Sequence, residues 1–145
     1  MKLSMRSDYG ARAVIDLARH YNRGPVQSAD IAARQAIPEA YLEQLLTTLR
    51  KSGLIRSTRG PHGGHELARP PTEIRFAEVI AALEGPLVPL DCLNDADACV
   101  VSPTCGMREI WQEVMASTRR ILEATTIEEL VERQKARESR VMYYI

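Results

Sequence analysis

Apolar residues spaced three and four apart predict two helices at the start of the chain. A first helix is expected from residue 7 or 8 to residue 21, and Asp8 near its start can cap free amides and oppose the helix dipole. The Gly24-Pro25 pair ends that segment. Ser28 then has the position of an N-cap for a short second helix over residues 29–34.

A third helix, expected from Pro38 to Lys51, has the clearest pattern of this half. Pro38 falls at a first-turn position, where its missing N–H has no cost, and Gly53 supplies the C-terminal stop. Its buried stripe consists of Leu42, Leu45, Leu46 and Leu49. Two helices joined by a tight turn, the second with an inward leucine stripe, predict a helix-turn-helix.

A β-hairpin is expected directly after this unit. Residues 54–57 and 65–68 have the pattern of two short strands, and a glycine-rich loop over residues 58–64 joins them. A hairpin in this position is a wing. The glycines do not form a nucleotide-binding loop, because no Lys-Ser/Thr pair follows and no helix begins there.

The second half begins with a short helix and an irregular segment. Residues 76–83 are expected to be helical, Gly85-Pro86 stops that helix, and residues 86–104 show no helical or strand period. From about residue 105 to residue 124 a strong helical period returns. Its stripe comprises Ile110, Trp111, Val114, Met115, Thr118, Ile121 and Leu122. Such a helix lies outside the N-terminal unit, and its copy in a second subunit is the simplest partner.

The last helix is expected to begin at a capping box formed by Thr126 and Glu129, and residues 138–145 remain unassigned. The predicted fold class is therefore mainly α, a winged helix-turn-helix with a long C-terminal dimerisation helix. Residues 1–85 form the expected DNA-binding domain, residues 86–104 a cysteine-containing loop, and residues 105–145 the dimerisation helix with the C-terminal helix.

Composition and charge extend this picture. The chain has 145 residues, 45% of them apolar, and no apolar run is long enough to cross a membrane. The N-terminal sequence MKLSMRSDYGARAV lacks a signal-peptide pattern, so the cytoplasm is the expected location. The net charge is zero, yet residues 1–70 carry a net +5 and residues 71–145 a net −5. A basic half fits a polyanionic partner, although chance clustering explains the count equally well.

The third helix and the wing carry the candidate DNA contacts. Short polar and forked cationic side chains are the groups that read base edges and bind phosphates. The candidates for base or sugar contacts are Glu39, Tyr41 and Gln44. The candidates for phosphate contacts are Arg50, Arg56 and Arg59, and Arg59 beside Gly60 at the wing tip can enter a narrow minor groove. These positions also suit an ordinary solvated helix, but the helix-turn-helix, the wing and the basic half together favour DNA binding.

The chain has three cysteines, Cys92, Cys99 and Cys105, spaced C-x6-C-x5-C. A structural disulfide is disfavoured in a reducing compartment and leaves one thiol unpaired. Zinc usually recruits closer cysteine pairs and a fourth Cys or His, and no His follows residue 65. An iron–sulfur cluster, a redox-active thiol and inert buried cysteines remain open on spacing alone.

Several motifs together resemble the IscR/NsrR family of bacterial regulators, of the Rrf type. They are residues 1–4 (MKLS), 41–46 (YLEQLL), 49–54 (LRKSGL) and 59–64 (RGPHGG), with the three-cysteine loop between a short helix and a long one. The resemblance covers nearly the whole chain. It implies a homodimer with winged helix-turn-helix heads, crossed dimerisation helices and an iron–sulfur cluster near the other subunit's first helix.

The resemblance also implies a ligand set. Cys92, Cys99 and Cys105 match the family's three cluster ligands, although the first gap has six residues where the family commonly has five. The branch with a [2Fe-2S] cluster uses a His three residues after the last Cys, where this chain has Arg108. In the nitric-oxide-sensing branch an Asp matching Asp8 completes a [4Fe-4S] cluster across the dimer. We therefore expect a [4Fe-4S] cluster with Asp8 of the partner subunit as fourth ligand, a [2Fe-2S] cluster being the alternative.

The expected function is an iron–sulfur-dependent repressor whose cluster state, set by nitric oxide, redox or iron status, controls binding to a double-stranded DNA operator. One alternative is a cluster-free regulator of the same fold that responds through thiol chemistry or a partner protein. A second is an iron–sulfur carrier or assembly protein with a vestigial helix-turn-helix. An enzyme is not expected, because no His, Ser or carboxylate grouping indicates acid–base or nucleophilic catalysis.

Overall fold

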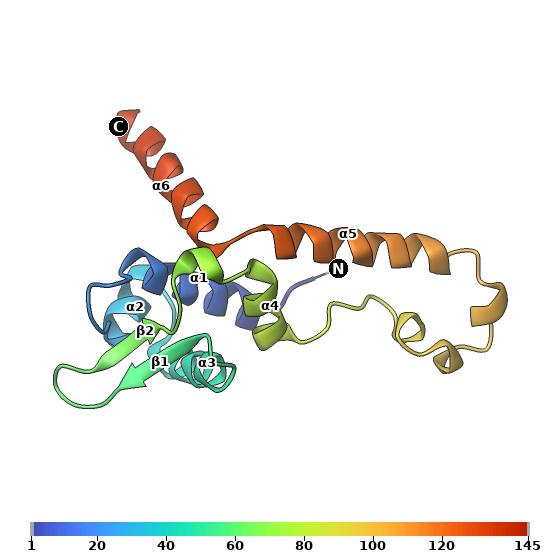
Figure 1. Ribbon diagram of the computed structural model, residues 1–145, viewed down its shortest axis with the longest axis horizontal. Helices are drawn as coiled ribbons and strands as arrows, with labels where there is room; N and C mark the ends of the chain where they lie inside the picture. The colour runs from blue at the N-terminus through green and yellow to red at the C-terminus, as the bar shows by residue number, and fades with distance from the viewer. Residues whose placement is uncertain (1, 145) are drawn as a thin grey trace.

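The computed structural model describes residues 2–144 and shows a mainly helical chain with one small antiparallel hairpin (Figure 1). The elements are α1 (Met5–Arg19), α2 (Ser28–Gln35), α3 (Glu39–Lys51), β1 (Ile55–Thr58), β2 (Gly64–Leu67), η1 (Pro71–Glu73), α4 (Phe76–Glu84), η2 (Asp91–Leu93), η3 (Ala96–Ala98), η4 (Ser102–Thr104), α5 (Arg108–Ala124) and α6 (Ile127–Tyr143), where η marks a 3₁₀ turn. The predicted fold class, a winged helix-turn-helix followed by a long C-terminal helix, is confirmed.

The core lies where α1, α2, α3 and α4 meet the hairpin, a unit that we call the head. The predicted leucine stripe of α3 forms its centre, and each of the four leucines is at most 2% exposed. Burial of one leucine side chain contributes roughly 1.5–3 kcal/mol, so this stripe alone fixes the orientation of α3. The opposite face of α3 is consequently turned to solvent.

The hairpin pairs Ile55 with Leu67 and Thr58 with Gly64, so both strands lie one residue closer to the loop than predicted, in the same register. The backbone of Val26 forms an isolated bridge with His65, with N–O distances of 2.9 and 2.8 Å. A Cβ on Gly64 would lie 2.5 Å from the Val26 carbonyl oxygen, and its φ of 148° also favours glycine. Only glycine fits this position.

Three predicted helix starts are wrong by a few residues. The N-cap of α1 is Ser4, and the Asp8 carboxylate binds the Arg12 guanidinium at 2.8 Å instead of capping the helix. Gln27 rather than Ser28 is the N-cap of α2, and Pro38 is the N-cap of α3 rather than a residue of its first turn. None of these three N-caps makes a side-chain hydrogen bond to the helix, so the cap preferences of the sequence do not locate these helix starts.

The start of α6 returns to the head. Ile127 and Val131 are buried in the same core as α1 and α4. The chain is fixed there by two backbone hydrogen bonds, from Phe76 N to Thr125 O at 2.8 Å and from Ile127 N to Ile74 O at 2.9 Å. Thr126 caps α6 as predicted and accepts from the Glu129 amide at 3.1 Å. The unassigned tail is helical as far as Tyr143.

Between α4 and α6 the chain leaves the head (Figure 1). Residues 86–107 contain three 3₁₀ turns, and α5 begins at Arg108, three residues later than predicted. No residue of α5 is fully buried. Exposed apolar side chains follow one of its faces, namely Met107, Ile110, Trp111, Val114 and Ile121. Among residues 2–144, no helix has the length and apolar character needed to span a membrane.

Candidate nucleic-acid interface and cysteine segment

The solvent face of α3 has a central stripe directly opposite the buried leucines. At 100° per residue this stripe consists of Ala40, Gln44, Thr47 and Lys51. Gln44 was predicted as a contact, whereas the other three were not, because sequence reasoning selected polar residues near the helix start. Their signal was nevertheless present, since they stand half a helical turn from the leucine stripe.

One edge of this face is connected to α2. Glu39 and Arg50 are exposed along the edge of α3 nearer to α2. Beside them the Ser28 hydroxyl donates to the Glu43 carboxylate, a contact between α2 and α3 that sequence reasoning missed. This bond holds the two helices of the helix-turn-helix in register on the side that faces solvent.

Tyr41 lies on the other edge and is half-buried. Its ring packs edge-on against Tyr9 of α1 with centroids 5.9 Å apart, and the Arg12 guanidinium lies 4.8 Å from the Tyr9 ring centre. Contacts of this kind are worth about 0.5–1.5 kcal/mol beyond area burial. The ring of Tyr41 therefore helps to position α3 on α1, in addition to any contact with DNA.

The wing carries the remaining predicted contacts. Arg59 and Gly60 are exposed at its tip, and Gly60 has a positive φ of 106° that the turn requires. Arg56 is also exposed, with its Nε 3.5 Å from the Glu66 carboxylate. That pair is too open to withdraw the guanidinium from a phosphate.

His65 adds no positive charge to this surface at neutral pH. Its burial lowers the pKa of the imidazole, the Arg50 charge lowers it further, and the Glu43 charge opposes both. The ring lies 2.8 Å from the Ser57 hydroxyl across the hairpin. The predicted phosphate contacts near the hairpin thus remain the three arginines at positions 50, 56 and 59.

The three cysteines lie at the 3₁₀ turns of the segment between α4 and α5. Cys92 is inside η2, Cys99 follows η3 and Cys105 follows η4. Each is a half-buried free thiol. Within residues 2–144 no three His, Cys, Asp or Glu side chains converge as a metal site. The donor set suits an iron–sulfur cluster chemically, with three thiols in fourteen residues, but one chain does not hold a preassembled site.

The candidate fourth ligand is accessible from outside the chain. The Asp8 side chain is 53% exposed, and its only recorded ion pair among the described residues is the one with Arg12. An exposed pair one helical turn apart contributes about 0.3–0.5 kcal/mol, so a second molecule can compete for this carboxylate. Asp8 is not gathered with the cysteines within the chain.

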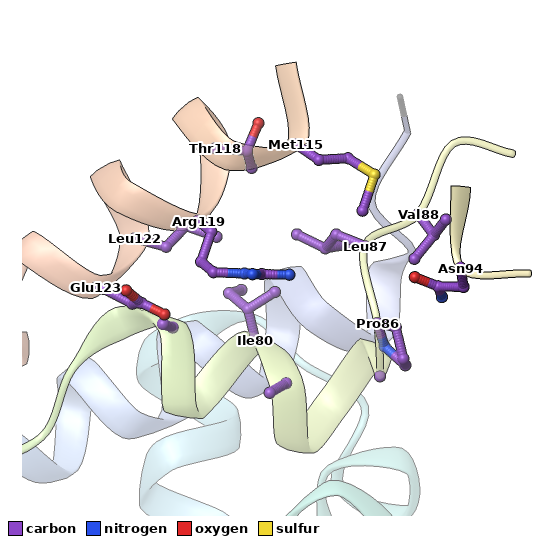
Figure 2. A pocket seen from close by; sticks show the side chains of 13 residues that line it. Ile80, Pro86, Leu87, Val88, Asn94, Met115, Thr118, Arg119, Leu122 and Glu123 are labelled. Atoms are coloured by element: carbon purple, nitrogen blue, oxygen red, sulfur yellow. The ribbon is translucent and has the colours of Figure 1, made fainter. Parts of the chain in front are cut away.

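A hollow of about 230 Å³ separates α4 from α5 next to this segment (Figure 2). Its floor is apolar, and the Arg119 side chain reaches across it between Ile80 and Leu87. The hollow opens to solvent, and no residue of α5 is buried, so α5 packs less closely on the head than the helices inside the head pack on one another.

Comparison with known proteins gives a consistent result over almost the whole chain. The sequence model of the Rrf2 family, described as iron-dependent transcriptional regulator, matches residues 3–133. Protein rrf2 of Nitratidesulfovibrio vulgaris is 40% identical over 131 residues, which cover 90% of this chain and 87% of that protein.

Solved structures agree with the sequence relatives. CymR, the global cysteine regulator of B. subtilis, superposes with a TM-score of 0.77 at 34% identity over 91% of this chain and 97% of that chain. IscR of T. potens superposes with a TM-score of 0.76 at 36% identity, over 92% and 88% of the two chains. The relatives are named as transcriptional regulators and not as enzymes. The chain is therefore a member of the Rrf2 family of winged helix-turn-helix transcriptional regulators.

Proposed function

We propose that the chain acts in the cytoplasm as a homodimeric repressor, and that an iron–sulfur cluster on residues 86–105 sets its affinity for a DNA operator. The observation that carries the proposal is the arrangement of the chain in three parts. An exposed reading face belongs to the head, an apolar face belongs to α5, and all three cysteines lie on the segment between them.

DNA reading is assigned to residues 1–85. The stripe around Gln44 has the width and polarity to enter the major groove, with the N-terminal turn of α3 nearest the bases. Glu39, Tyr41 and Gln44 stay as the proposed base or sugar contacts. Arg50, Arg56, Arg59 and Gly60 stay as the proposed backbone and minor-groove contacts. A dimer would read two half-sites about 34 Å apart, or a multiple of that spacing.

Dimerisation is assigned to residues 105–145. The apolar face of α5 leaves Met107 65%, Ile110 60% and Ile121 61% exposed in the single chain. Exposed apolar side chains in a row along one helix are typical of a surface that is covered in the assembly. A second copy of the same face is self-complementary and closes a twofold dimer.

Cys92, Cys99 and Cys105 would hold the cluster, and Asp8 of the partner subunit would complete the ligand set. Arg108 stands where a histidine ligand would be needed, and a guanidinium offers no lone pair to iron. This favours a [4Fe-4S] cluster with an oxygen ligand over a [2Fe-2S] cluster. When bound, such a group supplies sensitivity to oxidants, nitric oxide or iron supply.

The test is the absorption and electron paramagnetic spectrum of protein purified without oxygen, with iron and sulfide analysis. We expect a coloured protein with about four irons per subunit, and a colourless Cys92→Ser, Cys99→Ser, Cys105→Ser variant with the same helical content. A colourless, iron-free wild-type protein after anaerobic reconstitution would contradict the cluster while leaving DNA binding intact.

A second candidate is a cluster-free regulator that responds by thiol chemistry. It is favoured by the absence of converging metal donors within residues 2–144 and by the half-buried free thiols. The similar B. subtilis structure is described as a global cysteine regulator. This candidate predicts a colourless protein whose operator affinity changes after peroxide, and the change disappears when the cysteines are replaced by serine.

A further inference from the structure

A second hollow, larger and more polar, lies where α6 passes the ends of α1 and α2. Its volume is about 550 Å³, within the range of small-molecule sites. The lining residues are Asp16, Arg19, His20, Arg23, Arg34, Gln35, Gln134, Lys135 and Glu138. We call this the α1–α2–α6 hollow. Four of its side chains are cationic at neutral pH, and two are carboxylates.

The floor of the hollow is fixed by a buried carboxylate. Asp16 is 2% exposed and accepts hydrogen bonds from Arg34 Nε at 3.0 Å, Arg34 Nη2 at 2.8 Å and Gln35 Nε2 at 3.0 Å. Burial raises the pKa of Asp16, but these hydrogen bonds and the Arg34 charge outweigh it and hold the pKa below its ordinary value. Asp16 is therefore ionised, and its charge is matched by Arg34.

The wall formed by α6 is fixed in a similar way. Glu138 accepts from both terminal nitrogens of Arg19, at 2.6 and 3.0 Å. This bidentate ion pair joins the C-terminal half of α6 to α1. Each carboxylate of the hollow is thus engaged by one arginine, in the bidentate geometry that guanidinium and carboxylate groups favour.

Two cations remain without a carboxylate inside the hollow. The backbone N–H of Arg23 donates to the His20 carbonyl at 3.1 Å, but the Arg23 guanidinium has no hydrogen bond or ion pair among residues 2–144. Lys135 lies 3.5 Å from Glu132, which does not line the hollow, and both of these side chains are more than half exposed. Such an exposed pair is weak. The hollow therefore has a surplus of about two positive charges.

We propose that the α1–α2–α6 hollow binds a small molecule that carries a phosphate or carboxylate group. Arg23 and Lys135 supply positive charges that no carboxylate of the hollow neutralises. Arg34 and Gln35 supply hydrogen-bond donors whose positions are fixed by their bonds to Asp16. The ligand is not the operator, because α3 and the hairpin contribute no lining residue. α2 is the first helix of the helix-turn-helix. A ligand bound between α2 and α6 would therefore link the concentration of that ligand to the DNA affinity of the head.

The test is isothermal titration of the full-length protein with inorganic phosphate and, separately, with succinate, at constant ionic strength. We expect saturable binding of at least one anion, weakened at least tenfold in an Arg23→Gln, Lys135→Gln variant. Arg137→Gln on the exposed side of α6 is the matched control and should bind as wild type. Which anion binds more tightly distinguishes a phosphate from a carboxylate ligand.

A gain-of-affinity variant keeps the proposal falsifiable if the double variant fails to fold. Glu138→Gln frees Arg19 for the ligand, so anion binding should tighten severalfold even though α6 loses one attachment. Unchanged or weaker binding in a folded Glu138→Gln protein would overturn the proposal. So would heats no larger than those of sodium chloride, or displacement of bound phosphate by an operator duplex.

Discussion

The head and the segment that follows it are built on different principles. In the head, four helices and the hairpin enclose a continuous core whose apolar residues are at most 8% exposed. In residues 86–124 only Ser102 is buried, and α5 leaves a row of large apolar side chains in solvent. The head is stabilised within one chain. The segment with the cysteines and α5 leaves apolar surface exposed in the single chain, as is typical of a face that another molecule covers.

This difference bears on regulation. In the proposed dimer, a rigid head presents a fixed reading face, and we expect its affinity for DNA to change mainly through the distance and angle between the two heads. The hollow beside Ile80, Leu87 and Arg119 lies between α4 and α5, where such a change would act. The cysteines lie next to this hollow, in the less packed part of the chain.

A large effect is expected inside the head. Replacing Asp16 with alanine removes a buried carboxylate and its three side-chain hydrogen bonds, while the 41% exposed Arg34 side chain can be solvated. The free energy of unfolding should fall by about 2–4 kcal/mol. Asp8→Ala is the matched control on the same helix, because its pair with Arg12 is exposed and contributes below about 1 kcal/mol. Urea unfolding monitored by circular dichroism measures both. Equal losses in the two variants would contradict the buried role of Asp16.

The same pair gives a pH dependence. The folded-state pKa of Asp16 lies below the unfolded one, so its stabilisation is fully present above the unfolded pKa of about 4 and is lost as pH falls through the folded pKa. The gap in unfolding free energy between wild type and Asp16→Ala should therefore be constant near neutrality and shrink below about pH 4. A gap that widens on acidification would be inconsistent with an ionised Asp16.

A pair of apolar truncations separates the two regions directly. Leu45→Ala in the head should lower the free energy of unfolding by about 2–5 kcal/mol. Ile121→Ala on the exposed face of α5 removes no contact within the chain and should instead weaken dimerisation. Analytical ultracentrifugation over a range of protein concentrations, with thermal unfolding alongside, distinguishes them. A dimer unaffected by Ile121→Ala and by Trp111→Ala would place the dimer interface elsewhere.

Charge reversal on the reading surface should act on DNA without acting on the fold. The Arg50→Glu, Arg59→Glu variant should lose about 1–3 kcal/mol of operator binding and show a shallower salt dependence. Arg137→Glu, Arg140→Glu on the exposed side of α6 is the control of equal charge change. Fluorescence anisotropy with a labelled duplex at several salt concentrations measures this, and equal losses in both proteins would mean that the contact is non-specific.

The smallest effect is expected in the cysteine segment. The Ser102 hydroxyl is buried and has no hydrogen-bond partner among the described residues. Removing an unsatisfied polar atom is close to neutral or slightly stabilising, so Ser102→Ala should change the free energy of unfolding by about 0.5 kcal/mol or less, as measured by urea unfolding. A clear loss of stability would reveal a partner for this hydroxyl in the assembled protein.

Much of the head could be predicted from local pattern. The leucine stripe of α3 and the glycines of the wing each act over a few residues, so their positions in the sequence determine the structure nearby. Helix starts were missed by one to three residues because the N-caps of α1, α2 and α3 make no side-chain hydrogen bond that a capping pattern could indicate. The packing of the Tyr41 ring against Tyr9 was not predicted either, because this contact joins two helices that are distant in sequence.

Other features could not be predicted from periodicity. Glu138 lay in the unassigned tail, and only the folded chain brings it to Arg19, 119 residues earlier. Residues 86–104 have no period, so neither their 3₁₀ turns nor the placement of the cysteines followed from the pattern. The ligand roles of Cys92, Cys99, Cys105 and Asp8 remain predictions, because they depend on a second subunit and a bound group.

The most direct test of the account is the operator affinity of anaerobically purified protein, measured on a duplex selected from a random pool, before and after cluster removal by a chelator. The Cys92→Ser, Cys99→Ser, Cys105→Ser variant serves as the matched control. We expect wild-type affinity to change at least tenfold on removal, and the variant to keep the affinity of the cluster-free state under both conditions. Equal wild-type affinity in the two states would contradict control through the cysteine segment.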